Sequence, residues 1–331
     1  MGEANNPPMD APPRYPVLVG PTAGGKSALA VALCHAIGRA WGARAEIVTA
    51  DAFQIYRGMD IGTATPTTDE RGGIPHHLID LVDPRERFTV KDWLARADPL
   101  VEDLRSRGVV PVVVGGTNLY IQTFLDGMFE APEPGADTIR EIRVMPQRER
   151  RAELARVDPD AHARIDPGDE RRTIRALGVH RAAGVPISAL QRQWDAEDTA
   201  RRGAALVGLG WAPETINPRI NARVRAMIDR GLVEEAWALW ASDAFGPQSS
   251  RALGYRQLIA HFEGRCTLGD AIERIKIETR RFAKNQRTWL KRFRAREGSV
   301  WIEPEGREAP ELADEIADAL ARDGQRDDDT G

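Results

Sequence analysis

Cysteine and long hydrophobic runs are what this sequence most clearly lacks. Only Cys34 and Cys266 occur among its 331 residues, so we expect neither a disulfide framework nor a four-ligand zinc site. No apolar stretch approaches the roughly 18 residues that a transmembrane helix needs, and the proline-rich start contains no hydrophobic signal segment. We therefore expect no membrane association and a cytoplasmic location.

A strong excess of one charge is also missing. The 46 Lys and Arg residues nearly balance 50 Asp and Glu residues, and the net charge of −4 argues against non-specific coating of nucleic acid. The distribution is uneven, because positive charge is concentrated near the C-terminus. The length suits about two domains, or one large domain with an insertion, and 42% hydrophobic residues suffice for a core.

The clearest motif is a phosphate-binding loop between an apolar run at residues 15–19 and a helix-forming segment at 27–37. Glycines let backbone N–H groups turn toward phosphate oxygens, a lysine adds charge, and a hydroxyl can bind Mg²⁺. The loop alone fits a kinase, an NTPase or a transferase that handles diphosphate. The residues that match G-x-x-x-x-G-K-[ST], and that we expect to bind diphosphate, are Gly20, Pro21, Thr22, Ala23, Gly24, Gly25, Lys26 and Ser27.

The order of elements is that of an α/β protein with a parallel sheet. Strand-like segments at residues 17–19, 46–49 and 109–114 alternate with helical ones, and the last is apolar throughout, as in a strand buried on both faces. Functional groups gather beyond the carboxyl ends of such strands, so the phosphate loop, Asp51 and residues 115–117 should converge. We predict a P-loop NTPase-like parallel sheet flanked by helices, with a helical C-terminal part.

Changes in composition indicate the domains. Residues 131–202 are Arg-rich, punctuated by Asp-Pro and without a strand pattern, which predicts a small helical insertion domain. Residues 14–130 and 203–303 would form the P-loop catalytic core. Both ends offer few apolar groups to bury, so we expect disorder in residues 1–13 and toward the end of a tail at 304–331.

A more specific signal is carried by residues 49–64 (TADAFQIYRGMDIGTA). Together with the phosphate loop, this segment resembles the tRNA dimethylallyltransferase family, also called the IPP transferase family. Further segments resemble that family's motifs in the same order, so the resemblance extends from about residue 15 to 303. These segments are residues 74–80, 115–120, 251–256 and 281–289.

The resemblance implies a reaction. Dimethylallyl diphosphate would donate its five-carbon group to the exocyclic N6 amine of adenosine 37 in tRNA, next to the anticodon, and diphosphate would leave. The phosphate loop would thus stabilise a leaving group whose charge grows, with Mg²⁺ bound at Ser27. The implied partners are the tRNA anticodon stem-loop and the prenyl diphosphate, and we expect a monomer.

The catalytic residues follow from the two halves of that reaction. The adenine amine must lose a proton as it attacks, and Asp51 matches the family's aspartate as a base; its alternative role is to organise Mg²⁺, as in phosphoryl transfer. Lys26 would act on the diphosphate, and Thr22 could orient either the diphosphate or the amine. Arg219 and Arg223 lie four residues apart on one helical face, and by resemblance we assign Arg219 to catalysis and Arg223 to diphosphate binding.

Several segments are expected to bind tRNA. A stacked adenine must be extruded to reach a buried carboxylate, and Gln54 is placed to pair with its edge, whereas Phe53 fits a stacking partner or ordinary core equally well. Basic residues recur without an acid in a helix over residues 280–296. Phe282, Trp289 and Phe293 fall on the opposite face, which we expect to pack on the core. The residues that we assign to tRNA binding by resemblance are Asp51, Ala52, Phe53, Gln54, Thr117, Arg140, Arg171, Arg172, Arg175, Arg251, Tyr255, Arg256, Lys284, Gln286, Arg287 and Lys291.

Three other functions fit part of the sequence. A small-molecule kinase would use Lys26 on ATP phosphates and Arg171, Arg172 and Arg175 as a lid, but it leaves the basic helix unexplained. A prenyltransferase of free adenine nucleotides would share the donor site and need neither the insertion nor the long cationic face. A non-catalytic RNA-binding module would have no use for Lys26 and Asp51 together.

Overall fold

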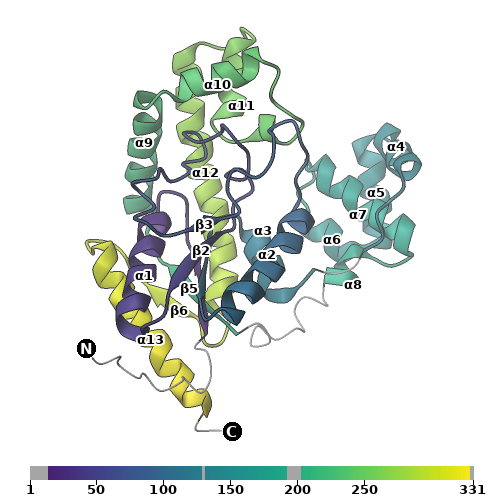
Figure 1. Ribbon diagram of the computed structural model, residues 1–331. Helices are drawn as coiled ribbons and strands as arrows, with labels where there is room; N and C mark the ends of the chain where they lie inside the picture. Colours follow the sequence, from purple (N-terminus) through teal and green to yellow (C-terminus); the bar gives the residue numbers. More distant parts are fainter. Residues whose placement is uncertain (1–13, 129–130, 192–202, 329–331) are drawn as a thin grey trace, which may run out of the picture. The chain divides into compact units, whose positions relative to one another are not determined.

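The computed structural model describes residues 14–128, 131–191 and 203–328 (Figure 1). Its contacts divide the chain into two compact units, one made of Met1–Phe124 and Ala200–Gly331 and the other of Leu125–Thr199. The predicted disorder of residues 1–13 lies outside the described residues, as do 192–202 at the end of the predicted insertion. In the part of the chain that is described, no helix combines the length and the apolar character needed to cross a bilayer.

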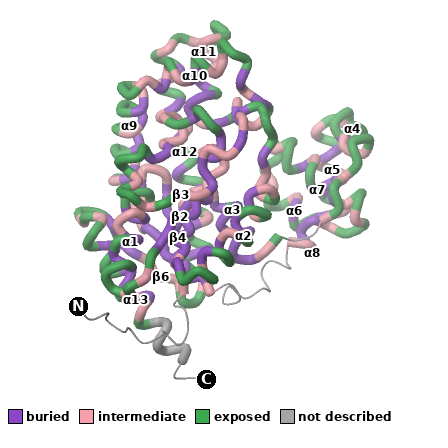
Figure 2. The backbone as a smooth tube through the Cα atoms, in the orientation of Figure 1, coloured by how far each residue is buried: buried purple, intermediate pink, exposed green. Residues whose placement is uncertain are grey.

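The larger unit is built on a six-stranded sheet in the order β3-β2-β4-β1-β5-β6, and every neighbouring pair is parallel. The prediction of an α/β fold with a parallel sheet is therefore confirmed. Figure 2 shows the sheet region as largely buried, since helices cover both of its faces. The strands are β1 (Tyr15–Val19), β2 (Ala45–Thr49), β3 (His76–His77), β4 (Val110–Gly115), β5 (Ala204–Leu209) and β6 (Val300–Ile302).

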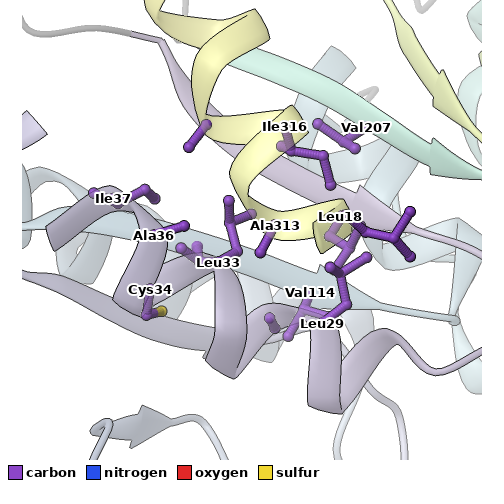
Figure 3. Close-up of a cluster of buried hydrophobic side chains, with 14 of the residues drawn as sticks. Leu18, Leu29, Leu33, Cys34, Ala36, Ile37, Val114, Val207, Ala313 and Ile316 are labelled. Atoms are coloured by element: carbon purple, nitrogen blue, oxygen red, sulfur yellow. The ribbon is translucent and has the colours of Figure 1, made fainter. Parts of the chain in front are cut away.

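One face of the sheet is covered by α1 (Lys26–Trp41) and α13 (Ala309–Asp328). Figure 3 shows Leu33 of α1 and Ile316 of α13 packed together with Val207 of β5, all of them fully buried. The tail at 304–331 thus differs from our expectation, because helix α13 extends to Asp328. Its buried residues Leu312, Ile316 and Leu320 recur every four residues, which is the apolar stripe that anchors a helix to a core.

The other face is covered by α2 (Val90–Ser106), which lies against β2 and β4. A capping box between Thr89 and Asp92 fixes the first turn of α2. One turn in, the indole of the fully buried Trp93 donates a hydrogen bond of 2.8 Å to the Thr49 carbonyl. Helix α2 therefore holds the last residue of β2, two positions before Asp51.

The C-terminal half of the larger unit is helical, and its longest helix, α12, is amphipathic, with Phe293 buried as expected and Trp289 half-buried. Its buried stripe is Ala271, Ile275, Thr279, Ala283, Gln286, Leu290 and Phe293. Phe282, expected on the docking face, is 44% exposed instead, because it lies one position off that stripe. The helices of this half are α9 (Pro213–Asp229), α10 (Leu232–Ala241), the 3₁₀ turn η3 (Ser249–Arg251), α11 (Tyr255–Phe262) and α12 (Leu268–Arg294).

The smaller unit contains only helices among its described residues. The carboxylate of Asp158 accepts backbone hydrogen bonds from Ala161 at 2.9 Å and Ser188 at 3.0 Å, so one buried acid joins two helices. Leu154 and Leu177 are fully buried in its apolar core. The helices are α4 (Ala136–Val144), α5 (Gln147–Val157), α6 (Pro159–Arg164), α7 (Glu170–Ala183) and α8 (Ile187–Gln191); α3 (Asn118–Asp126) precedes them.

Candidate active site

The phosphate loop connects β1 to α1 and turns tightly on itself. The Gly24 N–H donates to the Pro21 carbonyl at 3.1 Å, and Ala23 and Gly25 take the positive φ angles of 60° and 84°. Helix α1 begins at Lys26 without a side-chain cap, so its first N–H groups are left for another acceptor. An uncapped helix N-terminus behind a loop of this kind is an anion-binding site.

Two side chains from the C-terminal half of the chain bind backbone carbonyls of this loop. Trp211, two residues after the end of β5, donates from Nε1 to the Gly24 carbonyl at 3.1 Å. Arg219 of α9 donates from Nε to the Ala23 carbonyl at 3.1 Å, and its guanidinium carbon lies 4.6 Å from the centre of the Trp211 ring. Because β5 pairs with β1, the segment after β5 is brought to the loop that follows β1.

Gln286 of α12 holds the loop from another side. Its side-chain carbonyl accepts the Thr22 N–H at 2.9 Å, and its amide nitrogen donates to the Gly116 carbonyl at 2.8 Å. Gln286 is buried, so both hydrogen bonds form away from solvent. We expected a contact of this residue with tRNA, whereas its amide joins the phosphate loop to the loop after β4.

Glycine is required where the loop after β4 meets the phosphate loop. A methyl group on Gly116 would lie 2.8 Å from Gln286 Nε2 and 3.4 Å from the Lys26 ammonium nitrogen. A methyl group on the preceding Gly115 would lie 2.2 Å from the Ala50 carbonyl oxygen of the segment that follows β2. The residues after β1, β2 and β4 therefore converge, as the strand order requires.

The charges at this convergence perturb one another. Burial, and next the charge of Arg223, lower the pKa of Lys26 to about 8, while the charge of Asp51 acts in the opposite direction. Burial also lowers the pKa of Arg223, again opposed by Asp51. Two partly desolvated cations and one carboxylate thus share the site, and an anion placed there would relieve the repulsion between the cations.

Asp51 is fixed by its own backbone. Its Oδ1 accepts the N–H groups of Phe53 at 2.9 Å and Gln54 at 3.3 Å, and the Ala52 N–H donates to the Thr117 hydroxyl at 3.2 Å. The structure thus brings Asp51, Thr117 and Lys26 together. Phe53 is half-buried, and its ring centre lies 6.5 Å from that of Tyr56.

The other residues assigned to tRNA binding in the larger unit differ in exposure. Lys284 and Lys291 of α12 are exposed, and so is Arg251. Arg287 is half-buried, and its Nη1 has no hydrogen-bond partner among the residues that the structure describes. Tyr255 points inward, fully buried, and Arg256 next to it forms an ion pair with Glu278 of α12.

In the smaller unit, the four arginines assigned to tRNA binding are all exposed. Arg140 pairs with Asp137 at 2.7 Å and Arg172 with Asp169 at 3.4 Å, each within one helical turn. Such exposed pairs stabilise a helix weakly and break easily in favour of phosphate. Arg171 and Arg175 complete the set on α7.

The donor atoms available for a metal are oxygens. Ser27 is exposed in the first turn of α1, and the Asp51 carboxylate lies near Lys26. No cluster of three acidic, His or Cys side chains that could hold a metal occurs in the described residues. This donor set fits Mg²⁺, which keeps several water ligands and takes others from substrate phosphates, better than it fits zinc.

Trp211 and the loop-holding role of Gln286 were missed by sequence reasoning. The apolar run AALVGL, which ends two residues before Trp211, could have indicated β5, and a strand beside β1 places the segment that follows it at the phosphate loop. For Gln286 we find no sequence signal, since 264 residues separate it from Thr22.

Comparison with known proteins gives consistent results. The sequence model of the IPP transferase family matches residues 54–293. A tRNA dimethylallyltransferase of Anaeromyxobacter dehalogenans is 42% identical over 295 residues, which cover 88% of this chain and 95% of that protein. One of Bacillus subtilis is 38% identical over 292 residues, or 87% of this chain and 90% of that protein.

The fold also matches solved structures. The tRNA isopentenylpyrophosphate transferase of Bacillus halodurans superposes with a TM-score of 0.67 at 32% identity, over 95% of this chain and 99% of that one. The corresponding protein of Staphylococcus epidermidis gives a TM-score of 0.65 at 31% identity, over 93% of this chain and 98% of that one.

Proposed function

Because this chain belongs to the IPP transferase family, we propose that it transfers the dimethylallyl group of dimethylallyl diphosphate to tRNA. The acceptor in this proposal is the N6 amine of adenosine 37, next to the anticodon, and the second product is diphosphate. The observation that carries the proposal is the convergence of Lys26, Arg223 and Asp51 beside the phosphate loop. An anion site and a carboxylate in one place match a reaction with an anionic leaving group and a proton to remove.

The donor half of the reaction belongs to the phosphate loop. As the allylic C–O bond breaks, negative charge grows on the diphosphate, and groups already oriented toward it lower the barrier without reorganising. We expect this role for the uncapped N–H groups of α1, for Lys26, whose ammonium donates to the Pro21 carbonyl at 2.9 Å within the loop, and for Arg223. Trp211 and Arg219 support this half indirectly, because they fix the carbonyls of Gly24 and Ala23.

The acceptor half belongs to the segment after β2. The amine nitrogen forms a bond to the allylic carbon and gives up one proton, which Asp51 accepts. Thr117 supports the position of this carboxylate by accepting the N–H of Ala52. In this proposal the base and the leaving-group site both act at the reacting centre, because Asp51 and the phosphate loop follow strands of one parallel sheet.

Mg²⁺ is the cofactor that we propose, held by the Ser27 hydroxyl and by oxygens of the diphosphate. When bound, it would neutralise part of the diphosphate charge. Asp51 is a second oxygen donor within this site.

The proposed tRNA contacts in the larger unit follow α12. Lys284 and Lys291 are exposed cations on this helix, and the half-buried Arg287 lies three residues after the first and four before the second. In the smaller unit, the exposed arginines of α4 and α7 supply phosphate contacts of the same kind.

Nucleoside mass spectrometry tests the function. We would incubate an unmodified tRNA that carries adenosine 37 with the protein, Mg²⁺ and dimethylallyl diphosphate, beside an Asp51→Ala control. The proposal predicts an isopentenyl mass gain on one adenosine that the control lacks. If free adenosine monophosphate is prenylated and none of several tRNAs is, the acceptor is a free nucleotide and the tRNA proposal is refuted.

A further inference from the structure

The segment at residues 51–64 carries Asp51 but forms neither helix nor strand, so its shape depends on side-chain contacts. Its two ends are tied together by Gln54, whose amide nitrogen donates to the carbonyls of Thr63 at 3.2 Å and Ala64 at 3.0 Å. Ala64 has a φ of 52°, a left-handed conformation that an alanine adopts only where its surroundings enforce it. Turn hydrogen bonds from the Ala64 N–H to the Ile61 carbonyl at 3.1 Å and from the Thr65 N–H to the Asp60 carbonyl at 2.9 Å shape this end, but they leave the N–H groups of residues 60–62 for a partner outside the segment.

Glu235, in the first turn of α10, makes that contact. Its carboxylate accepts three successive backbone N–H groups: those of Asp60 at 2.9 Å, Ile61 at 2.8 Å and Gly62 at 3.1 Å. Successive N–H groups that point at one anion form a nest, and hydrogen bonds to a charged acceptor are stronger than neutral ones. One side chain thus fixes a stretch of loop backbone 175 residues away in sequence.

Tyr255, the first residue of α11, completes the arrangement. Its hydroxyl donates to Glu235 at 2.5 Å and accepts the Gly62 N–H at 3.2 Å. Burial and the charge of Glu235 raise the pKa of Tyr255, so the hydroxyl keeps its proton and remains a donor. The ring packs directly on Gly62, where an added methyl group would lie 2.4 Å from a ring carbon.

We propose that Glu235 is a positioning residue for prenyl transfer. Glu235 fixes residues 60–62, the next two carbonyls anchor Gln54, and the Gln54 N–H helps to hold the Asp51 carboxylate. This assignment rests on the proposed function, because it is the proposed base that is held. The diphosphate side has its own support in Gln286, Trp211 and Arg219, so loss of Glu235 should affect the acceptor half alone.

The test compares Glu235→Gln with Glu234→Gln. The two carboxylates are neighbours in the first turn of α10, but Glu234 is exposed and forms no hydrogen bond with residues 60–62 in the part of the chain that the structure describes. In Glu235→Gln, an N–H₂ group replaces one acceptor and faces the loop N–H groups. We expect amide hydrogen exchange of residues 60–64 to accelerate at least tenfold, and kcat with tRNA to fall at least tenfold, while the Kd for dimethylallyl diphosphate changes less than twofold. Glu234→Gln should match the parent protein in all three.

Tyr255→Phe is the second variant, because it removes the hydroxyl and keeps the ring on Gly62. Tyr255→Phe should also accelerate hydrogen exchange and lower kcat with tRNA, each by less than Glu235→Gln does, and leave the donor Kd nearly unchanged. Unchanged exchange at residues 60–64 in Glu235→Gln would overturn the proposed contact, and faster exchange with unchanged kcat would overturn the role in catalysis. If the parent protein prenylates no tRNA, the proposed function is refuted instead. The hydrogen-exchange comparison would still test whether Glu235 holds residues 60–62.

Discussion

Lys26 should change its protonation state when the donor binds. Burial and the charge of Arg223 hold its pKa at about 8 in the protein without ligand, so the ammonium is about 90% charged at pH 7 and about 10% charged at pH 9. A bound diphosphate favours the charged form strongly. Binding should therefore take up about 0.1 proton at pH 7 and about 0.9 proton at pH 9, and the affinity should weaken about tenfold between these pH values.

Isothermal titration calorimetry checks this directly. Dimethylallyl diphosphate would be titrated in two buffers of different ionisation enthalpy at each pH, with Mg²⁺ present, and the difference in heat gives the number of protons taken up. Lys26→Arg is the matched control, because arginine stays charged throughout this range while the donor's own ionisation is unchanged. Normal binding at pH 9 without proton uptake would refute the reasoning about Lys26.

Three further predictions concern the surroundings of the site. Gly116→Ala should lower the free energy of unfolding by about 1–3 kcal/mol and weaken donor binding, because its methyl group would lie 2.8 Å from Gln286 Nε2. Urea unfolding checks this against Gly269→Ala, whose methyl group would meet nothing closer than 3.8 Å, and equal stability of the two variants would contradict it. Gln286→Leu keeps the size of the side chain but removes the partner of the Thr22 N–H and the Gly116 carbonyl, so the free energy of unfolding should fall by about 1–3 kcal/mol. Calorimetry should show a weaker donor affinity, and an unchanged affinity would contradict a role of Gln286 in shaping the loop. Lys284→Glu combined with Lys291→Glu should weaken tRNA binding while donor affinity is retained, and it should reduce the slope of log affinity against log salt concentration by about 2. Filter binding measures this slope, and an unchanged slope would show that α12 does not contact the RNA.

Local patterns in the sequence predicted the centre of the sheet and the phosphate loop. Strands β1 and β4 are apolar runs, β2 has an apolar centre, and the glycine spacing of the loop dictates its turn, so these elements can be recognised without tertiary information. Asp51 comes two residues after the end of β2, and the rule for parallel sheets places it beside the loop. Strands β3 and β6 have two and three residues, too few for a periodic signal, and neither was predicted.

The residues that shape the site from a distance could not be predicted. Gln286 and Glu235 act on backbone groups 264 and 175 residues away, and nothing in their own neighbourhoods indicates those partners. The face that α12 buries was predicted only in part, because Phe293 is buried as expected while Phe282 is exposed. Gln286 was expected to contact tRNA, and in the fold it is buried with two hydrogen-bond partners for its amide.

The central claim is that Asp51 removes the proton from the attacking amine in a pocket where the phosphate loop holds the leaving group. The most direct measurement is the single-turnover rate of Asp51→Asn at saturating tRNA and dimethylallyl diphosphate, with the affinity for donor and Mg²⁺ measured alongside. The account predicts a rate about 10²–10⁴-fold below that of the parent protein, with both affinities unchanged. A rate restored by excess Mg²⁺, together with weakened donor binding, would contradict it and make Asp51 the organiser of the metal.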